Sequence, residues 1–466
     1  MYSILLLVLI LSFVGFCTTN EPHDKSVSIN SKEYEKKYNI KIISKEETTC
    51  EKSEFLNLAH MSLKTTNNDI IQSNVIRHVS LYNNFLKKVP HNILDLVPQL
   101  SCLNLSCNSI NIYESNFIRH ANLRVLDLSY QKKSIVNNIP EMEFVGETEG
   151  INGQNIYNII EYNKYKYMIF NSTNMKCPNL EYLVLNGNDI SDFQWDFNLS
   201  FPKLIRLDLV NVYADTIKQD FFNKIPTSLK ILHLENNNLR NLTLPKLGEI
   251  MALYLDGNPL ERLDIISMSL RTLSLTNCTN KFEGYFGTPH LQELDLSRNN
   301  FDDAFASARF NFTFPVLHML ILDYNKLSNI PNLNINSQQF NELSLNYNTI
   351  KYIRPYSFKN LKDLIKLSLK GNKLYRLEKE TFLGLEKLEY LDLSENQLNF
   401  LSPDWAWPLQ KLTFLNVNSN QFASISEIGV FSIRSLQYLF VTNNSFTKIS
   451  TLELDPLPNF VTVYLA

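Results

Sequence analysis

The chain has 466 residues, of which 44% are hydrophobic and 20% are charged, and its formal net charge is -3. This composition is typical of a globular protein and lacks the basic excess that marks nucleic-acid binders. Only 12 glycines occur, which leaves little material for a glycine-rich loop that cradles phosphates. The composition therefore argues against a nucleic-acid partner and against a nucleotide cofactor.

The N-terminal segment is apolar over residues 4–16, broken only by Ser12 and Gly15. This run is too short to span a bilayer comfortably, and the small residues Gly15 and Cys17 suit a signal-peptidase site. We expect residues 1–17 to be a cleaved signal peptide; the alternative is an N-terminal membrane anchor. No second run of spanning length follows, so we expect a secreted, extracellular product without a membrane span.

Two further segments precede the first repeat. Residues 18–43 are charged and weakly patterned, which indicates a flexible leader. Residues 44–75 are expected to form an N-terminal cap over the open end of the core.

Sequons of the form Asn-x-Ser/Thr are candidate glycosylation sites in an exported chain. They begin at Asn104, Asn171, Asn198, Asn241, Asn277, Asn311 and Asn443.

A sequence repeat begins at residue 76 and decides the architecture. Its clearest units, residues 100–108 and 388–396, both fit the pattern L-x-x-L-x-L-x-x-N. The last five intervals, from Phe340 to Phe460, are each 24 residues. Further copies start at Ile76, Leu123, Leu180, Leu204, Leu229, Ile250, Leu270, Leu291, Leu317, Phe340, Leu364, Leu412 and Leu436.

The repeat predicts an α/β leucine-rich-repeat solenoid, a horseshoe, over residues 76–466. Each L-x-L core is a short strand whose leucines point inward, and stacked repeats share one core. A parallel sheet then lines the concave face, with irregular or short helical segments on the convex face. The Asn after each strand can satisfy buried backbone groups. Cys278, Gln131 and Val212 occupy that position in three repeats, so Cys278 is expected to be a buried structural thiol.

Three irregularities interrupt the array. Residues 132–178 form an insertion that is either functional or disordered, and its length and composition favour disorder. Between Leu229 and Leu291 the repeats shorten to 20 or 21 residues, so this stretch should bend differently from its flanks. Residues 460–465 begin another strand, with no C-terminal cap after it. Either the sequence is incomplete or a partner covers that end.

The repeat resembles that of extracellular animal leucine-rich-repeat proteins, including Toll-like receptor ectodomains. The short repeats at residues 253–260 and 273–278 are similar to those of secreted insect leucine-rich immune proteins. The resemblance covers about residues 50–466 and implies protein recognition, often in innate immunity. The C-terminal cysteine cluster and coiled coil of the immune proteins, and the membrane span and signalling domain of the receptors, have no counterpart here.

No catalytic or metal-binding motif is present in the sequence, so we predict neither an enzyme nor a cofactor. His233 and His318 occupy outward strand positions in distant repeats and are expected to be surface residues. Acidic residues recur between the two leucines of the strand, where we expect them to face water and not to form a catalytic pair. They are Asp127, Asp208, Asp295 and Asp392.

The cysteines leave their pairing open. If Cys17 departs with the signal peptide and Cys278 is a core residue, four remain, and four cysteines allow three pairings. These are Cys50, Cys102, Cys107 and Cys177.

Aromatic residues align at the outward positions of the last repeats. Tyr390, Phe414 and Tyr438 follow one another in successive strands, with Phe440 beside them, and Tyr324 and Tyr347 form a second pair. Such a row is a cross-strand ladder that stabilises the sheet, an aromatic binding surface, or the contact surface of a C-terminal cap that this sequence lacks.

The resulting hypothesis is a recognition module whose concave face binds a protein partner or another subunit. The alternatives are a structural protein of the extracellular matrix or of cell adhesion, and a fragment of a receptor ectodomain.

Overall fold

The structure is a computed structural model. The expected signal peptide (1–17), leader (18–43) and insertion as far as residue 175 lie outside its described residues. So do two of the sequons, Asn171 and Asn311. Within the described ranges, no helix combines the length and apolar character that a membrane crossing requires. The described residues are 54–66, 72–112, 118–131, 176–190, 196–214, 217, 219–244, 247–278, 283–304, 314–333, 335, 338–447, 451–458 and 461–465.

The chain divides into two compact units: residues 1–112 with 122–145, and residues 113–121 with 146–466. The first unit contains four strands that pair in parallel and in chain order. The first of them lies within the segment expected to cap the array and extends the ladder by one strand. These strands are β1 (Phe55–Asn57), β2 (His78–Ser80), β3 (Cys102–Asn104) and β4 (Val125–Asp127).

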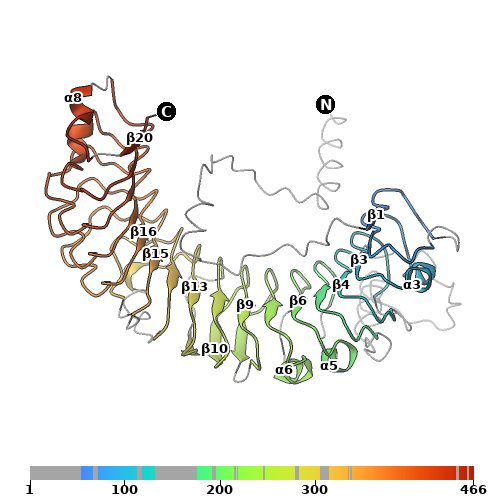
Figure 1. Cartoon of the computed structure of the whole chain (residues 1–466). Coiled ribbons are helices and arrows are strands. Elements are labelled where there is room, and N and C mark those ends of the chain that lie inside the picture. The colour runs from blue at the N-terminus through green and yellow to red at the C-terminus, as the bar shows by residue number, and fades with distance from the viewer. Residues whose placement is uncertain are drawn as a thin grey trace, which may run out of the picture. The chain divides into compact units, whose positions relative to one another are not determined.

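The second unit carries the longer parallel ladder (Figure 1). Its strands are three residues long, and each pairs with the next coil in the same register. In order they are β5 (Tyr182–Val184), β6 (Arg206–Asp208), β7 (Ile231–His233), β9 (Ala252–Tyr254), β11 (Thr272–Ser274), β13 (Glu293–Asp295), β14 (Met319–Ile321), β15 (Glu342–Ser344), β16 (Lys366–Ser368), β17 (Tyr390–Asp392), β18 (Phe414–Asn416), β19 (Tyr438–Phe440) and β20 (Thr462–Tyr464).

The core is a stack of leucines from the middle of the strands, with Val79 in that place in β2 and Val463 in β20. Leu367, Leu391 and Leu415 pair in successive strands and are completely buried. One coil cannot bury such a residue alone, so the stack makes each coil depend on its neighbours. The prediction of a parallel-strand solenoid is confirmed.

The Asn at the end of each motif joins two coils. The side-chain amide of Asn372 donates to the carbonyls of Leu369 at 3.0 Å and of Leu345 in the preceding coil at 2.9 Å. Its Oδ1 accepts from the backbone N–H of Ile350 at 3.1 Å. Gln131 makes the equivalent bonds in its own coil. These bonds satisfy backbone groups that would otherwise be buried without partners.

The residue before that Asn adopts a left-handed backbone in coil after coil. Asn443 has a φ value of 52°, in the region that favours glycine or asparagine, and the tyrosines Tyr324 and Tyr347 adopt similar values of 55° and 52°. Gly371 occupies the same position with φ 68°, and a Cβ there would lie 2.3 Å from the Tyr347 ring. This position therefore turns the chain out of the sheet at a fixed place in each coil.

Short helices and a second sheet form the side away from the ladder. The helical segments are α3 (His91–Leu96) in the first unit, and α5 (Phe197–Ser200), α6 (Gln219–Lys224), η3 (Ile425–Ile428) and α8 (Thr451–Leu454) in the second. Asp196 begins α5 by accepting a hydrogen bond from the Leu199 N–H at 3.0 Å.

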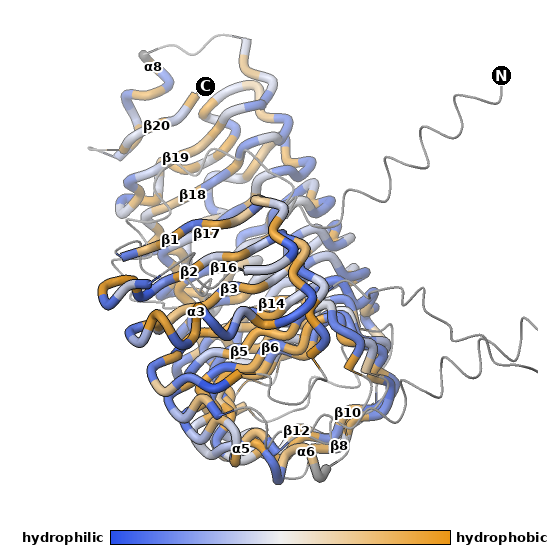
Figure 2. The backbone as a smooth tube through the Cα atoms, turned by 90° about the vertical axis from the view of Figure 1, so that its right-hand side faces the viewer, coloured by the Kyte–Doolittle hydropathy of each residue, from blue (hydrophilic) through white to orange (hydrophobic). Residues whose placement is uncertain are grey.

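The short coils between Leu229 and Leu291 carry that second parallel sheet. It consists of β8 (Asn241–Leu244), β10 (Arg262–Ile266) and β12 (Glu283–Gly287). Figure 2 shows these strands together, opposite β5 and β6. Irregular or short helical segments were expected on the convex side. A coil of 20 or 21 residues is too short to include such a segment. The chain instead crosses the convex side as an extended strand.

Three cysteines are buried thiols, namely Cys107, Cys177 and Cys278. Burial raises the pKa of the Cys177 thiol to about 11 and that of Cys278 to about 12. The expectation that Cys278 is a structural thiol is confirmed. The expected pairing among four cysteines is wrong for Cys107 and Cys177, whose side chains the leucine core encloses.

Candidate binding surface

Every strand of the ladder in the second unit presents outward side chains on one face. In β17 they are Tyr390 and Asp392, and Ser394 continues the row after the strand ends. Because the register is constant, residues at one position form columns across neighbouring coils. The side chains in these columns therefore determine the chemistry of this face.

An aromatic ladder crosses the strands β17 to β20, and we define it as Tyr390, Phe414, Phe440 and Tyr464. The ring centroids of Tyr390 and Phe414 are 4.3 Å apart, those of Phe414 and Phe440 4.9 Å, and those of Phe440 and Tyr464 4.1 Å. The first and last pairs are stacked, and the middle pair is tilted by 37°. The ladder runs diagonally across the strands. Phe414 pairs with Tyr438 in the strand register, but its ring packs against that of Phe440, two residues further along β19.

Three of these four rings, Tyr390, Phe414 and Phe440, are among the residues named from the sequence, and the structure places them side by side. Tyr438 lies where it was predicted, on β19 next to the ladder, and is 36% exposed. Tyr464 was not predicted as a site residue, although its place in the column of Phe440 could have identified it. Lys366 ends the row, with its Nζ 5.5 Å from the Tyr390 ring centroid.

Tyr324 and Tyr347 lie on a different column, at the left-handed position that leads out of the sheet. Their rings stack at 4.5 Å between centroids. The guanidinium of Arg298 lies 4.1 Å above the Tyr324 ring. The Tyr347 hydroxyl donates to Glu395 at 3.1 Å. This pair is a second aromatic group along one edge of the face, separate from the aromatic ladder.

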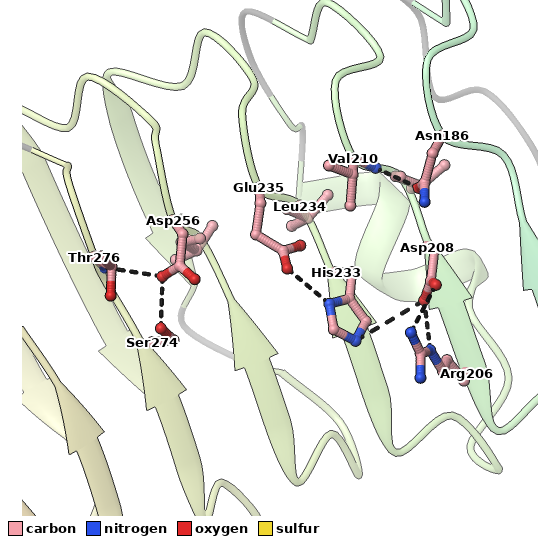
Figure 3. Close-up of polar contacts among 12 residues, drawn as sticks. Asn186, Arg206, Asp208, Val210, His233, Leu234, Glu235, Asp256, Ser274 and Thr276 are labelled. Carbon is pink, nitrogen blue, oxygen red and sulfur yellow. Dashed lines mark hydrogen bonds and ion pairs between the residues drawn. The ribbon is translucent and has the colours of Figure 1, made fainter. Parts of the chain in front are cut away.

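A polar cluster that the sequence did not reveal lies on β6, β7 and β9 (Figure 3). Arg206 binds Asp208 with two hydrogen bonds, of 2.8 and 2.9 Å. The His233 ring stacks on Tyr254 at 4.3 Å, its Nδ1 lies 2.9 Å from Oε1 of Glu235, and its Nε2 lies 4.0 Å from Asp208. The prediction that His233 is a surface residue is wrong, since only 3% of it is exposed.

The recurring acids between the leucines do not all face water. Asp208 is 4% exposed and Asp392 is 7% exposed. Asp392 accepts a hydrogen bond from the Ser394 backbone N–H at 2.8 Å. Outward side chains of adjacent strands, about 4.8 Å apart, cover one another. The expectation of solvated acids therefore fails for these two residues: the Asp392 carboxylate caps a backbone N–H just after the strand, and the Asp208 carboxylate binds the Arg206 side chain.

The sequon residues differ in accessibility. Asn198, Asn241, Asn277 and Asn443 are exposed. Asn104 is half-buried, and its Oδ1 accepts hydrogen bonds from the backbone N–H and hydroxyl of Ser106 at 2.9 and 2.6 Å.

His318, which was expected at the surface, is half-buried, and its Nε2 lies 2.7 Å from Oε1 of Gln339. Among the described residues, no group of His, Cys, Asp or Glu is arranged to hold a metal ion.

Comparison with known proteins agrees with this geometry. A family model described as leucine rich repeat matches residues 364–422, and a second of the same description matches residues 176–192 and 288–304. The chain is built of leucine-rich repeats. No enzymatic family is indicated for these leucine-rich repeats.

Sequence relatives include both receptors and smaller leucine-rich proteins. Human lumican is 31% identical over 234 residues, which cover 45% of this chain and 62% of lumican. Mouse keratocan is 27% identical, covering 48% of this chain and 63% of keratocan. Sheep Toll-like receptor 9 is 26% identical, covering 38% and 20% respectively. The chain thus spans less than two thirds of the length of each of these relatives.

Solved structures support the fold. A leucine-rich-repeat protein of Leptospira interrogans has a TM-score of 0.52 at 23% identity, covering 88% of this chain and 94% of that one. The structure of a TLR13–ssRNA13 complex has a TM-score of 0.51 at 17% identity, covering 89% and 62%. At these identities the likeness establishes the solenoid of leucine-rich repeats alone.

Proposed function

We propose that this protein is a secreted recognition module that binds a protein partner through the aromatic ladder. The observation that carries the proposal is the stack of four half-buried rings across neighbouring strands, beside the exposed Tyr438. Large aromatic side chains dominate the binding energy of protein interfaces. Their ring faces are turned toward one another, so the ladder offers ring edges, which suit apolar side chains of a protein.

Secretion is supported by the apolar N-terminal run, by the exposed sequons and by Cys102, which is disulfide-bonded. Disulfides persist chiefly in oxidising compartments. Similarity to Toll-like receptor 9 supports a role in innate immunity. Similarity to lumican and keratocan supports the alternative, a structural or adhesive leucine-rich-repeat protein.

The test compares the wild-type chain with the double variant Phe414→Ala/Tyr438→Ala as baits in extracellular fluid of the source organism. A protein captured by the wild type is then titrated against both. We expect the double variant to bind about thirtyfold more weakly, which corresponds to about 2 kcal/mol. The matched control is Phe400→Ala, which removes an exposed phenylalanine that lies outside the strands.

Equal affinity of the wild type and the double variant, with both still folded, would show that the aromatic ladder only stabilises the sheet. Binding that grows with the number of immobilised copies and is insensitive to both variants would favour the adhesive alternative.

A further inference from the structure

The middle of the outward face is rich in carboxylates. The outward positions of β7, β9, β11, β13 and β14, together with the residue that continues each row, hold no lysine or arginine. We call their acidic residues the central acidic row; it consists of Glu235, Asp256, Glu293, Asp295 and Asp323.

Four of these five carboxylates, all except Glu235, accept hydrogen bonds from hydroxyl or amide groups. Asp256 accepts from the Thr276 N–H at 2.8 Å and from the Ser274 hydroxyl (Figure 3). Asp323 accepts from the Ser344 hydroxyl at 2.7 Å and from the Asn346 N–H at 2.8 Å. Hydrogen bonds of this kind fix the direction of the Asp256 and Asp323 carboxylates, and neither carboxylate forms a salt bridge within the described residues.

Glu235 provides an independent sign of a missing partner. Only 7% of its side chain is exposed, and one carboxylate oxygen, Oε1, lies 2.9 Å from the His233 ring. The other oxygen, Oε2, is buried without a hydrogen-bond partner in the described part of the chain. A buried carboxylate oxygen left without a partner costs stability. Figure 3 shows Glu235 between His233 and Asp256, on the same face of the sheet.

The flanking basic groups are already engaged. Arg206 pairs with Asp208, the Arg298 guanidinium covers the Tyr324 ring, and Lys366 binds Glu342 at 2.6 Å. Burial, together with the negative charges of Glu235 and Asp295, raises the pKa of Asp256 above its ordinary value. Burial likewise raises the pKa of Glu293 and of Asp323. The row therefore consists of like charges that repel one another and would be stabilised by a cation.

We propose that the central acidic row binds a lysine- or arginine-rich segment of a protein partner, with Glu235 at the floor of the site. The inference rests on the proposed function in that it uses the same face of the sheet. From β7 to β14 the row crosses four strand spacings of about 4.8 Å, or about 19 Å, which about six residues of extended chain span. Ammonium or guanidinium groups would supply donors to the carboxylate oxygens.

The experiment measures binding of a fluorescent hexa-arginine peptide by anisotropy at low and at physiological salt, with hexa-glutamate as the charge control. We expect hexa-arginine alone to bind, and more weakly as salt increases. The variant Asp256→Asn/Asp323→Asn should weaken this binding at least tenfold, and Glu235→Gln should also weaken it. The matched control, Glu249→Gln/Asp404→Asn, changes the net charge equally at exposed residues outside the sheet.

Unchanged binding to the Asp256→Asn/Asp323→Asn variant, or an equal loss in the matched control, overturns the proposal. Thermal melts establish that each variant is folded, and the double variant keeps the test decisive if Glu235→Gln does not fold. Phe414→Ala should leave hexa-arginine binding unchanged. Failure of this peptide test therefore leaves the proposed role of the aromatic ladder standing, and failure of that role leaves the peptide result standing.

Discussion

The central part of the ladder, β7 to β14, and its C-terminal part, β17 to β20, share one backbone and one leucine core. Leu253 in the former and Leu391 in the latter occupy the same motif position and are both fully buried. Their outward residues differ completely, since the first part carries the central acidic row and the second the aromatic ladder. The inward positions thus specify the fold, whereas the outward positions are open to encode recognition.

The largest effect should come from the shared core. Leu253→Asp and Leu391→Asp each place an unpaired charge between stacked coils, and we expect either to destabilise the protein by about 4 kcal/mol or more. Urea denaturation followed by circular dichroism measures this loss. If one variant unfolded and the other remained as stable as the wild type, the two parts would not share an equivalent core.

A smaller loss should follow removal of a ring from the aromatic ladder. Phe414→Ala deletes the contacts with Tyr390 and Phe440, and we expect a cost of about 2 kcal/mol. Tyr438→Ala, which removes an exposed neighbouring ring, should cost about 0.5 kcal/mol or less. Thermal melts of the two variants give the comparison, and equal losses would contradict the assignment of Phe414 to the ladder and of Tyr438 to its exposed side.

The buried acid beside Leu391 should also matter, although less. Asp392→Ala removes the acceptor of the Ser394 N–H, and we expect a loss of about 1–2 kcal/mol in the free energy of unfolding. Asp392→Asn retains an oxygen acceptor and should lose less. A destabilisation by alanine no greater than that by asparagine would show that this hydrogen bond contributes nothing.

The smallest effect concerns charge in the central part. The pKa values of Asp256, Glu293 and Asp323 are raised in the folded protein. These carboxyl groups therefore bind protons more strongly in the folded protein than in the unfolded chain. Their contribution to the free energy of unfolding is present at acidic pH and is lost as the pH rises through the folded pKa. Asp256→Asn should raise the stability at pH 7 by a few tenths of a kcal/mol, about the scale of surface changes. A clear destabilisation by Asp256→Asn at pH 7, measured by urea denaturation, would contradict the expected gain in stability.

The sequence predicted the strands well because the repeat fixes both their spacing and their inward side chains. It also placed Tyr390, Phe414, Tyr438 and Phe440 on one face, since parallel coils in register turn a sequence interval into a column. It could not show which column a ring would lean toward, so the contact between Phe414 and Phe440 emerged only from the structure.

Other features depended on packing that no sequence interval encodes. His233 occupies an outward position, yet Tyr254, Glu235 and Asp208 enclose it. The second sheet could have been suspected from the alternation in residues 241–244 and 262–266, which is a strand pattern. The shortness of these coils was visible in the sequence, but its structural consequence was not.

That second sheet has a mechanical consequence. In the coils that carry β8, β10 and β12, hydrogen-bonded ladders run along both sides of the solenoid. To splay these coils apart, a pulling force must break backbone bonds on the two sides together. Coils such as those of β16 and β17 are joined by a strand ladder on one side only in the described chain. Under tension we expect the two-sided segment to behave as a stiff insert, with elastic strain collecting in the coils that flank it.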